Sequence, residues 1–164
     1  MNPGDRWTAW IEENGETFFL YARQQCRSES DAKDVLQDAL AETWKRASGE
    51  VPDRALVFAT IRRRAIDMGR SMDRRAIREV DFAGDGPDWF CPDFSANDVH
   101  RQLASAIEQL PGALQEVVIL RIWGDLTFPA IAELVRIPVA TATSRFRYAL
   151  ERLRECAALT ELIS

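Results

Sequence analysis

The sequence predicts an all-α protein made of two small helical domains joined by an acidic flexible linker. Apolar residues recur at three- and four-residue steps through most of the 164 residues, which is the period of an amphipathic helix, and no stretch shows the alternation typical of a strand. One stretch, residues 79–96, has no helical period and is acidic. The chain length fits one medium domain or two small domains with a linker between them.

Three helices are expected in an N-terminal domain spanning residues 1–78. The first covers about residues 7–26, and Gly15 weakens its helical pattern. The second, "SESDAKDVLQDALAETWKRA", has the clearest pattern, because its apolar residues share one face and its polar residues fall away from it. The third runs from about residue 52 to residue 77 and is rich in arginine. The apolar face of the second helix holds Ala32, Val35, Leu36, Ala39, Leu40, Thr43 and Trp44, and its polar face holds Asp34, Gln37 and Asp38.

The linker assigned to residues 79–96 has a composition unlike that of the flanking segments. The stretch "EVDFAGDGPDWFCPDFSAND", residues 79–98, contains six acidic residues, two glycines, two prolines and four aromatic residues, with no basic residue. Glycine, proline and acidic residues disfavour a packed core. Four aromatic side chains are unusual in a solvated tether, so we expect part of this segment to dock on a surface.

A C-terminal domain spanning residues 97–164 is expected to hold the remaining helices. Pro111 closes the first of them, and "GALQEVVILRIW" forms the second, which we expect Gly124 to close with a left-handed cap. Thr127 can cap the next short helix, and Pro129 is tolerated in its first turn.

The stretch "IAELVRIPVATATSRFRYALERLRE", residues 131–155, predicts a short helix, a sharp turn and a longer helix. Counting 100° per residue from Thr141 separates the longer helix into a core face and a polar face. This is the arrangement of a helix-turn-helix, whose second helix can enter the major groove of DNA. An ordinary helical hairpin with a solvated polar face is the alternative. The core face holds Ala142, Phe146, Ala149, Leu150 and Leu153, and the polar face holds Thr143, Ser144, Arg147, Tyr148 and Arg152.

The distribution of charge also favours a nucleic-acid partner. The net charge is −5, but residues 54–78 carry eight arginines against two aspartates, followed by the acidic linker. Local patches rather than the net sum decide association with polyanions. Solvated helix faces remain the alternative explanation for such runs.

Other classes of site find little support in the sequence. The three cysteines are far apart and there is a single histidine, so no disulfide framework and no metal site is expected. We expect no membrane insertion, a cytoplasmic location, no cofactor, no small-molecule substrate and no enzymatic activity, because no apolar span, phosphate-binding loop or nucleophile motif is present.

Two stretches resemble the sigma-70 family of RNA polymerase sigma factors, specifically the short extracytoplasmic-function type. "LPGALQEVVILRIWGDLTFPAIAELVRIPVATATSRFRYALERLRE" resembles region 4 of that family, in which "eIAeil.iPvgTvkSRl.RAl..Lre" is typical. "SDAKDVLQDALAETWKR" and "VFATIRRRAIDMGRSMDRR" resemble region 2, with its "dAeDlvQevFlrlWr" and "WLyriarNlaiDhlRrrrr". The matches cover about three quarters of the chain in the order and at the spacing of the family.

The resemblance implies a set of partners and contact residues. Bacterial core RNA polymerase would bind the second helix, and promoter DNA would bind the third helix at the −10 element and the recognition helix at the −35 element. An inhibitory anti-sigma factor is a common partner of this type. The residues implied for polymerase are Asp34, Gln37 and Asp38; for the −10 element Arg62, Arg63, Arg64, Arg70, Arg74 and Arg75; and for the −35 element Thr141, Thr143, Ser144, Arg145, Arg147 and Tyr148.

The chain departs from the family pattern at several contact positions. The asparagine that the family uses to hold a flipped −10 base is replaced by Arg63, so base choice there is expected to differ. In the recognition helix, Ala140 replaces a glycine and Thr143 replaces a basic residue. Each lost phosphate contact lowers the salt dependence of DNA binding by about one unit, so we expect weaker or unusual promoter binding.

Two functions other than a sigma factor remain open from the sequence. A stand-alone helix-turn-helix regulator would explain the C-terminal half, but it leaves "DAKDVLQDALAETW" and the acidic linker without a role. A degenerate sigma-like adaptor that acts through protein contacts would fit the altered "VATATSR". Failure to bind core polymerase would favour the regulator, and polymerase binding without promoter-specific transcription would favour the adaptor.

Overall fold

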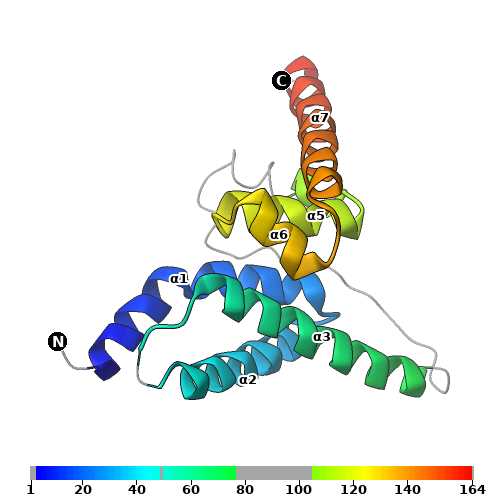
Figure 1. Ribbon diagram of the computed structural model, residues 1–164. Coiled ribbons are helices and arrows are strands. Elements are labelled where there is room, and N and C mark those ends of the chain that lie inside the picture. The colour runs from blue at the N-terminus through cyan, green and yellow to red at the C-terminus, as the bar shows by residue number, and fades with distance from the viewer. Residues whose placement is uncertain (1–2, 49, 77–104, 164) are drawn as a thin grey trace. The chain divides into compact units, whose positions relative to one another are not determined.

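A computed structural model of the chain describes residues 3–48, 50–76 and 105–163, with side chains outside that description at residues 3, 70–76 and 156–163. Every regular element in these ranges is a helix (Figure 1), as predicted. Contacts along the chain define two compact units, Met1–Trp89 and Phe90–Ser164. The division falls within the predicted linker, residues 79–96, which lies outside the described residues.

The first unit is a bundle of three helices, each of which contacts the other two. Helix α1 spans Pro3–Gln25, α2 spans Glu29–Ala47 and α3 spans Arg54–Ala76. Ser28 is the N-cap of α2, where its hydroxyl accepts a hydrogen bond of 3.1 Å from the backbone N–H of Asp31. This cap satisfies one of the amides that the first turn of a helix leaves unpaired. The three predicted helices are confirmed, with ends shifted by a few residues.

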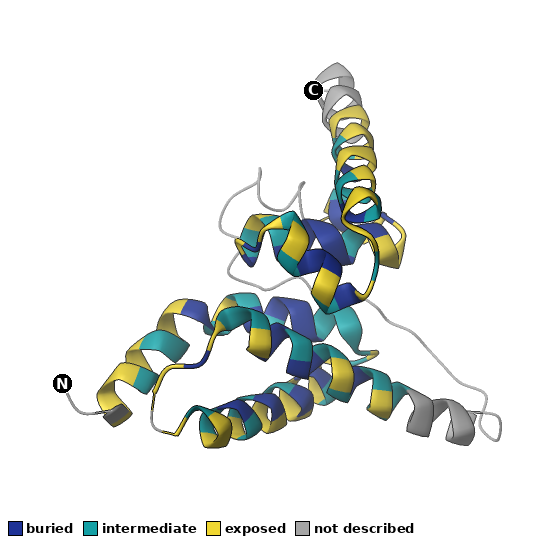
Figure 2. Cartoon of the chain, in the orientation of Figure 1, coloured by how far each residue is buried: buried dark blue, intermediate teal, exposed yellow. Residues whose placement is uncertain are grey.

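Aromatic side chains form the centre of the first unit. Phe58 of α3 lies edge-on to Phe18 and Tyr21 of α1, with ring centroids 5.1 and 5.4 Å apart, and all three are fully buried. From α2, the buried residues are Ala32, Val35, Ala39 and Thr43, which belong to the predicted apolar face. Figure 2 shows buried residues, coloured dark blue, on each of the three helices. Edge-to-face pairs add to the hydrophobic gain of burial.

The second unit contains four described elements after a helical stretch at residues 105–108. Helix α5 spans Gly112–Val118 and continues as a π-helical segment, η2, over Ile119–Trp123. Helix α6 spans Phe128–Val135 and α7 spans Val139–Ile163. A hydrophobic core cluster packs residues 107–118 of this unit against α7. It consists of Ile107, Leu110, Leu114, Val118 and Ala149, with Trp123, Phe146 and Leu153 packed against it.

Gly124 does not form the left-handed cap that the sequence suggested. Its φ is −76°, and the residue with positive φ is Asp125, at 54°. The helix instead widens into η2, so that the N–H of Gly124 donates to the carbonyl of Ile119 at 2.9 Å. A Cβ at Gly124 would lie 2.6 Å from the carbonyl oxygen of Leu120. Glycine is therefore required here for close backbone approach and not for its conformational freedom.

Gly124→Ala is expected to lower the free energy of unfolding by about 1–3 kcal/mol, because the new methyl group meets backbone that cannot move aside cheaply. Gly15→Ala is the matched control. A Cβ at Gly15 meets only Cγ2 of Ile11, at 3.8 Å, so alanine in the middle of α1 should raise stability by about 0.5–1 kcal/mol. Denaturant titration of each full-length variant measures both effects. Equal stability of Gly124→Ala and the wild type would contradict the close approach.

Candidate nucleic-acid interface

A tight turn joins α6 to α7. Helix α6 ends at Val135, where Arg136 caps it in a left-handed conformation with φ of 65°. The N–H of Ile137 donates to the carbonyl of Ala132 at 3.0 Å, and α7 begins at Val139. Thr127 caps the start of α6 by accepting from the N–H of Ala130 at 3.2 Å. The short turn and the two helices form the helix-turn-helix that the sequence predicted.

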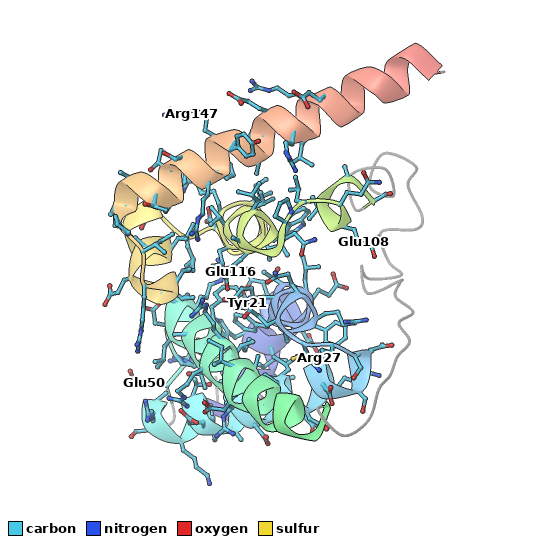
Figure 3. All side chains as sticks on the ribbon, turned by 90° about the vertical axis from the view of Figure 1, so that its right-hand side faces the viewer. Tyr21, Arg27, Glu50, Glu108, Glu116 and Arg147 are labelled. Carbon is cyan, nitrogen blue, oxygen red and sulfur yellow. The ribbon has the colours of Figure 1, made fainter. Side chains whose placement is uncertain are left out.

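Helix α7 separates its apolar and polar residues as predicted. Ala142 and Ala149 are fully buried, whereas Ser144 and Arg147 are exposed. Figure 3 shows Arg147 projecting from α7 into solvent. Of the predicted contact residues, Ser144, Arg147 and Tyr148 are exposed, and Thr141, Thr143 and Arg145 are half-buried. The polar face can therefore meet a partner while the apolar face stays in the core.

Two contacts modify the chemistry of this face. The hydroxyl of Thr143 donates to the carbonyl of Val139 at 3.0 Å, so its proton is engaged within α7. The guanidinium carbon of Arg152 lies 5.3 Å from the centre of the Tyr148 ring, within the range of a cation–π contact. Arg152 is exposed and adds a cation to the polar face.

Aromatic contacts hold α7 against α6. The rings of Phe128 and Phe146 meet edge-on with centroids 5.5 Å apart. The guanidinium of Arg121 also lies over the ring of Phe128, 4.7 Å from the ring centre, and donates to the carbonyl of Leu126 at 2.9 Å. Helical periodicity placed Phe146 on the core face but gave no role to Arg121 or Phe128. These residues lie on three different elements, η2, α6 and α7, so periodicity along one helix could not pair them.

Two neighbouring arginines of α3, Arg63 and Arg64, share the carboxylate of Glu42 on α2. Arg63 donates through Nη2 to Oε2 of Glu42, and Arg64 donates to Oε1 through Nε at 3.2 Å and Nη2 at 2.7 Å. Arg46 lies 3.8 Å from the same Oε2. Glu42 was not among the predicted residues, because its role depends on how α2 packs against α3. The side chains of Arg70, Arg74 and Arg75 lie outside the described residues.

The polar face of α2 is open to solvent. Asp34, Gln37 and Asp38 are all exposed, on the side opposite the buried apolar residues. Asp38 also lies 3.6 Å from Nη1 of Arg64, so its charge is partly balanced within the unit. A surface of two carboxylates and one amide suits a partner that offers cations and hydrogen-bond donors.

Similarity to known proteins agrees with this arrangement. The family model described as Sigma-70, region 4 matches residues 100–153. The chain is 34% identical to the ECF RNA polymerase sigma factor RpoE of Cereibacter sphaeroides, over 77% of this chain and 72% of the relative. It is 31% identical to the RNA polymerase sigma-E factor of Streptomyces avermitilis, over 89% and 82% of the two chains. The chain belongs to the extracytoplasmic-function sigma factors of the sigma-70 family.

A solved structure extends the likeness to the fold. The sigma factor RpoE of Bartonella quintana, determined in complex with the anti-sigma factor NepR, matches with a TM-score of 0.68 and 17% sequence identity. The match covers 93% of this chain and 97% of the other. The chain is accordingly an alternative sigma factor that directs transcription. Neither a stand-alone regulator nor a degenerate adaptor is favoured by these relatives.

Other kinds of site find no support within the described part of this sigma factor. No group of three or more His, Cys, Asp or Glu residues there could hold a metal ion, and no helix there is long and apolar enough to cross a membrane. Cys26 is a free, half-buried thiol. Burial, and to a lesser extent the charge of Asp31, raises the pKa of Cys26 to about 11, so the reactive thiolate is scarce at neutral pH.

The hydrogen bond from Arg63 holds the pKa of Glu42 below its ordinary value of 4.5, and Arg64 adds to this effect against the opposing cost of desolvation. The side chain of Glu42 is 17% exposed, and those of Arg63 and Arg64 are 49% and 36% exposed. Solvent therefore screens the attraction considerably. Because the folded state favours the ionised carboxylate, its stabilising contribution is complete above pH 4.5 and is lost as the pH falls through the lower folded-state pKa.

Glu42→Gln is expected to lower the free energy of unfolding at neutral pH by about 1 kcal/mol, because the amide cannot replace the charge-assisted hydrogen bonds. The difference from the wild type should shrink as the pH falls below 4.5, since protonation then removes the same charge from the wild type. Thermal unfolding of both proteins across this range tests the expectation. A difference that stays constant with pH would show that the carboxylate charge is not what stabilises the contact.

Proposed function

We propose that this sigma factor binds bacterial core RNA polymerase and directs it to promoters by reading a −10 and a −35 element. In this proposal residues 1–78 bind the polymerase and the −10 element, residues 79–96 are the linker, and residues 97–164 bind the −35 element. The proposal rests on the exposed polar face of α7, which directly follows the short turn from α6. A helix presented in this way fits the major groove.

The −35 element is read through the polar residues of α7. The guanidinium of Arg147 can donate two hydrogen bonds to one guanine or to a phosphate, and the hydroxyl of Ser144 can bond to either. Both side chains are exposed. Thr141, Thr143 and Arg145 are half-buried and would make shorter-range or supporting contacts, together with the exposed ring of Tyr148.

The N-terminal unit supplies the other two contacts. Arginines along α3 would engage the −10 element, with phosphates and unpaired bases as partners. The exposed side chains of Asp34, Gln37 and Asp38 on α2 would bind core polymerase through complementary charge. We include an anti-sigma factor among the partners, as in the Bartonella quintana complex. The factor acts in the cytoplasm and contributes no chemistry, because nucleotidyl transfer belongs to the polymerase.

Replacing Ser144 and Arg147 together by alanine should abolish transcription that depends on the −35 element. The loss of one bidentate contact costs about 1–3 kcal/mol, so promoter affinity should fall on the order of 10- to 100-fold. Binding to core polymerase should be unchanged. In vitro transcription and a pull-down of core polymerase measure the two activities. Gln109→Ala, an exposed residue of the same unit, is the control, and equal loss of both activities would refute the assignment.

The polymerase contact can be tested with Asp34→Arg and Gln37→Ala. A reversed charge on the face of α2 should weaken binding to core polymerase on the order of tenfold or more, because like charges then face each other. Glu13→Arg, an exposed carboxylate of α1, makes the same change of charge elsewhere in the unit and serves as control. Titration of labelled core polymerase measures the affinity. Unchanged binding of the α2 variants would show that this face is merely solvated.

A further inference from the structure

Arg63 and Arg64 differ in how much of each guanidinium is engaged. Arg64 directs both Nε and Nη2 to Oε1 of Glu42, and its Nη1 lies 3.6 Å from Oδ2 of Asp38. Arg63 uses only Nη2, on Oε2 of Glu42. Its Nε and Nη1 have no partner among the described side chains, its Nη2 keeps a second N–H, and the side chain is 49% exposed. Arg64 is therefore committed to α2, whereas Arg63 keeps free donors.

The two oxygens of Glu42 are divided between the two arginines. Arg64 fixes the orientation of the carboxylate by donating twice to Oε1, and Oε2 then holds the end of Arg63. A free arginine loses up to about 2 kcal/mol of rotamer entropy when it is ordered. An arginine that is already held loses less of this entropy on binding DNA. The arrangement thus prepares the free donors of Arg63 for a partner with closely spaced acceptors.

Guanine is the base that fits such a donor group. It presents O6 and N7 side by side, and an arginine bonds to both in the commonest specific contact between proteins and DNA. Arg63 can form this pair of bonds through Nη1 and the second N–H of Nη2, which point in the same direction. We propose that Glu42 is a positioning residue that holds Arg63 to read a guanine of the −10 element, while Arg64 serves the packing of α2 against α3. This inference rests on the proposed function, because it requires α3 to meet the −10 element.

The test uses holoenzyme assembled from core RNA polymerase and the full chain, with promoter DNA randomised across the −10 element. Sequencing of the bound DNA should show one position at which the wild type prefers guanine. Arg63→Lys and Glu42→Gln should each reduce that preference on the order of tenfold or more, while other positions of the motif stay unchanged. Arg63→Lys keeps its charge, so the dependence of affinity on salt should also stay unchanged.

A purely structural role for Glu42 predicts a different result. Val35 of α2 is 1% exposed and lies in the core, so Val35→Ala destabilises the same unit without touching Glu42. The guanine preference should survive in Val35→Ala but not in Glu42→Gln. Glu42→Gln should add nothing to Arg63→Lys, because both act on the same contact. Loss of the preference in Val35→Ala, or its survival in Glu42→Gln, would overturn the role of Glu42.

The remaining outcomes separate this inference from the proposed function. A wild-type holoenzyme that selects a two-part motif without a guanine in the −10 element would overturn the role of Arg63 and leave the function standing. If the guanine preference is unchanged in Arg63→Lys, the role of Arg63 is also overturned and the proposed function still stands. If core polymerase is not bound, or no shared motif is selected, the proposed function fails and this inference with it.

Discussion

Burial of one stripe of α7 fixes which side of that helix can meet DNA. Ala149 packs among Ile107, Leu110, Leu114 and Val118, and small side chains allow α7 to approach them closely. With Ala142 and Ala149 fully buried, the helix cannot rotate without exposing apolar surface, which costs about 25 cal/mol per Å². Ser144 and Arg147 are therefore held toward solvent. The edge-on contact of Phe128 with Phe146 fixes the position of α6 beside it.

In the first unit, ion pairs between α2 and α3 hold the charged side chains in place. An arginine-rich helix would repel itself and bind any polyanion, but Asp38 and Glu42 of α2 balance part of the charge on α3. The extent of this neutralisation differs between two arginines, because Arg63 donates to Glu42 through one nitrogen and Arg64 donates through two. Partly neutralised cations give a weaker general attraction to phosphate, and fixed donors give a stronger preference for one base. Asp38 lies on the exposed polar face of α2 and also pairs with Arg64 of α3, so the proposed polymerase contact and the proposed −10 contact share this residue.

Periodicity explains which features could be predicted. The apolar stripe of α2 and the two faces of α7 repeat at helical spacing, so both are evident in the amino-acid sequence itself. The expectation for Gly124 was wrong because glycine after a helix usually takes positive φ, whereas here it accommodates the backbone of Leu120. The π-helical turn and the left-handed Asp125 accompany that contact. A glycine in the sequence indicates that the backbone needs either a close approach or a positive φ. It does not indicate which of the two is needed.

The order of residues by itself determined the helices, the turn between α6 and α7, and the side of each helix that is apolar, because these depend on neighbours within a few positions. Tertiary structure alone decided that Glu42 joins Arg63 to Arg64 and that Arg121 supports Phe128. It also decided which arginine keeps free donors. Such contacts depend on the rotation and separation of packed helices, which the cores set through the fit of many side chains at once.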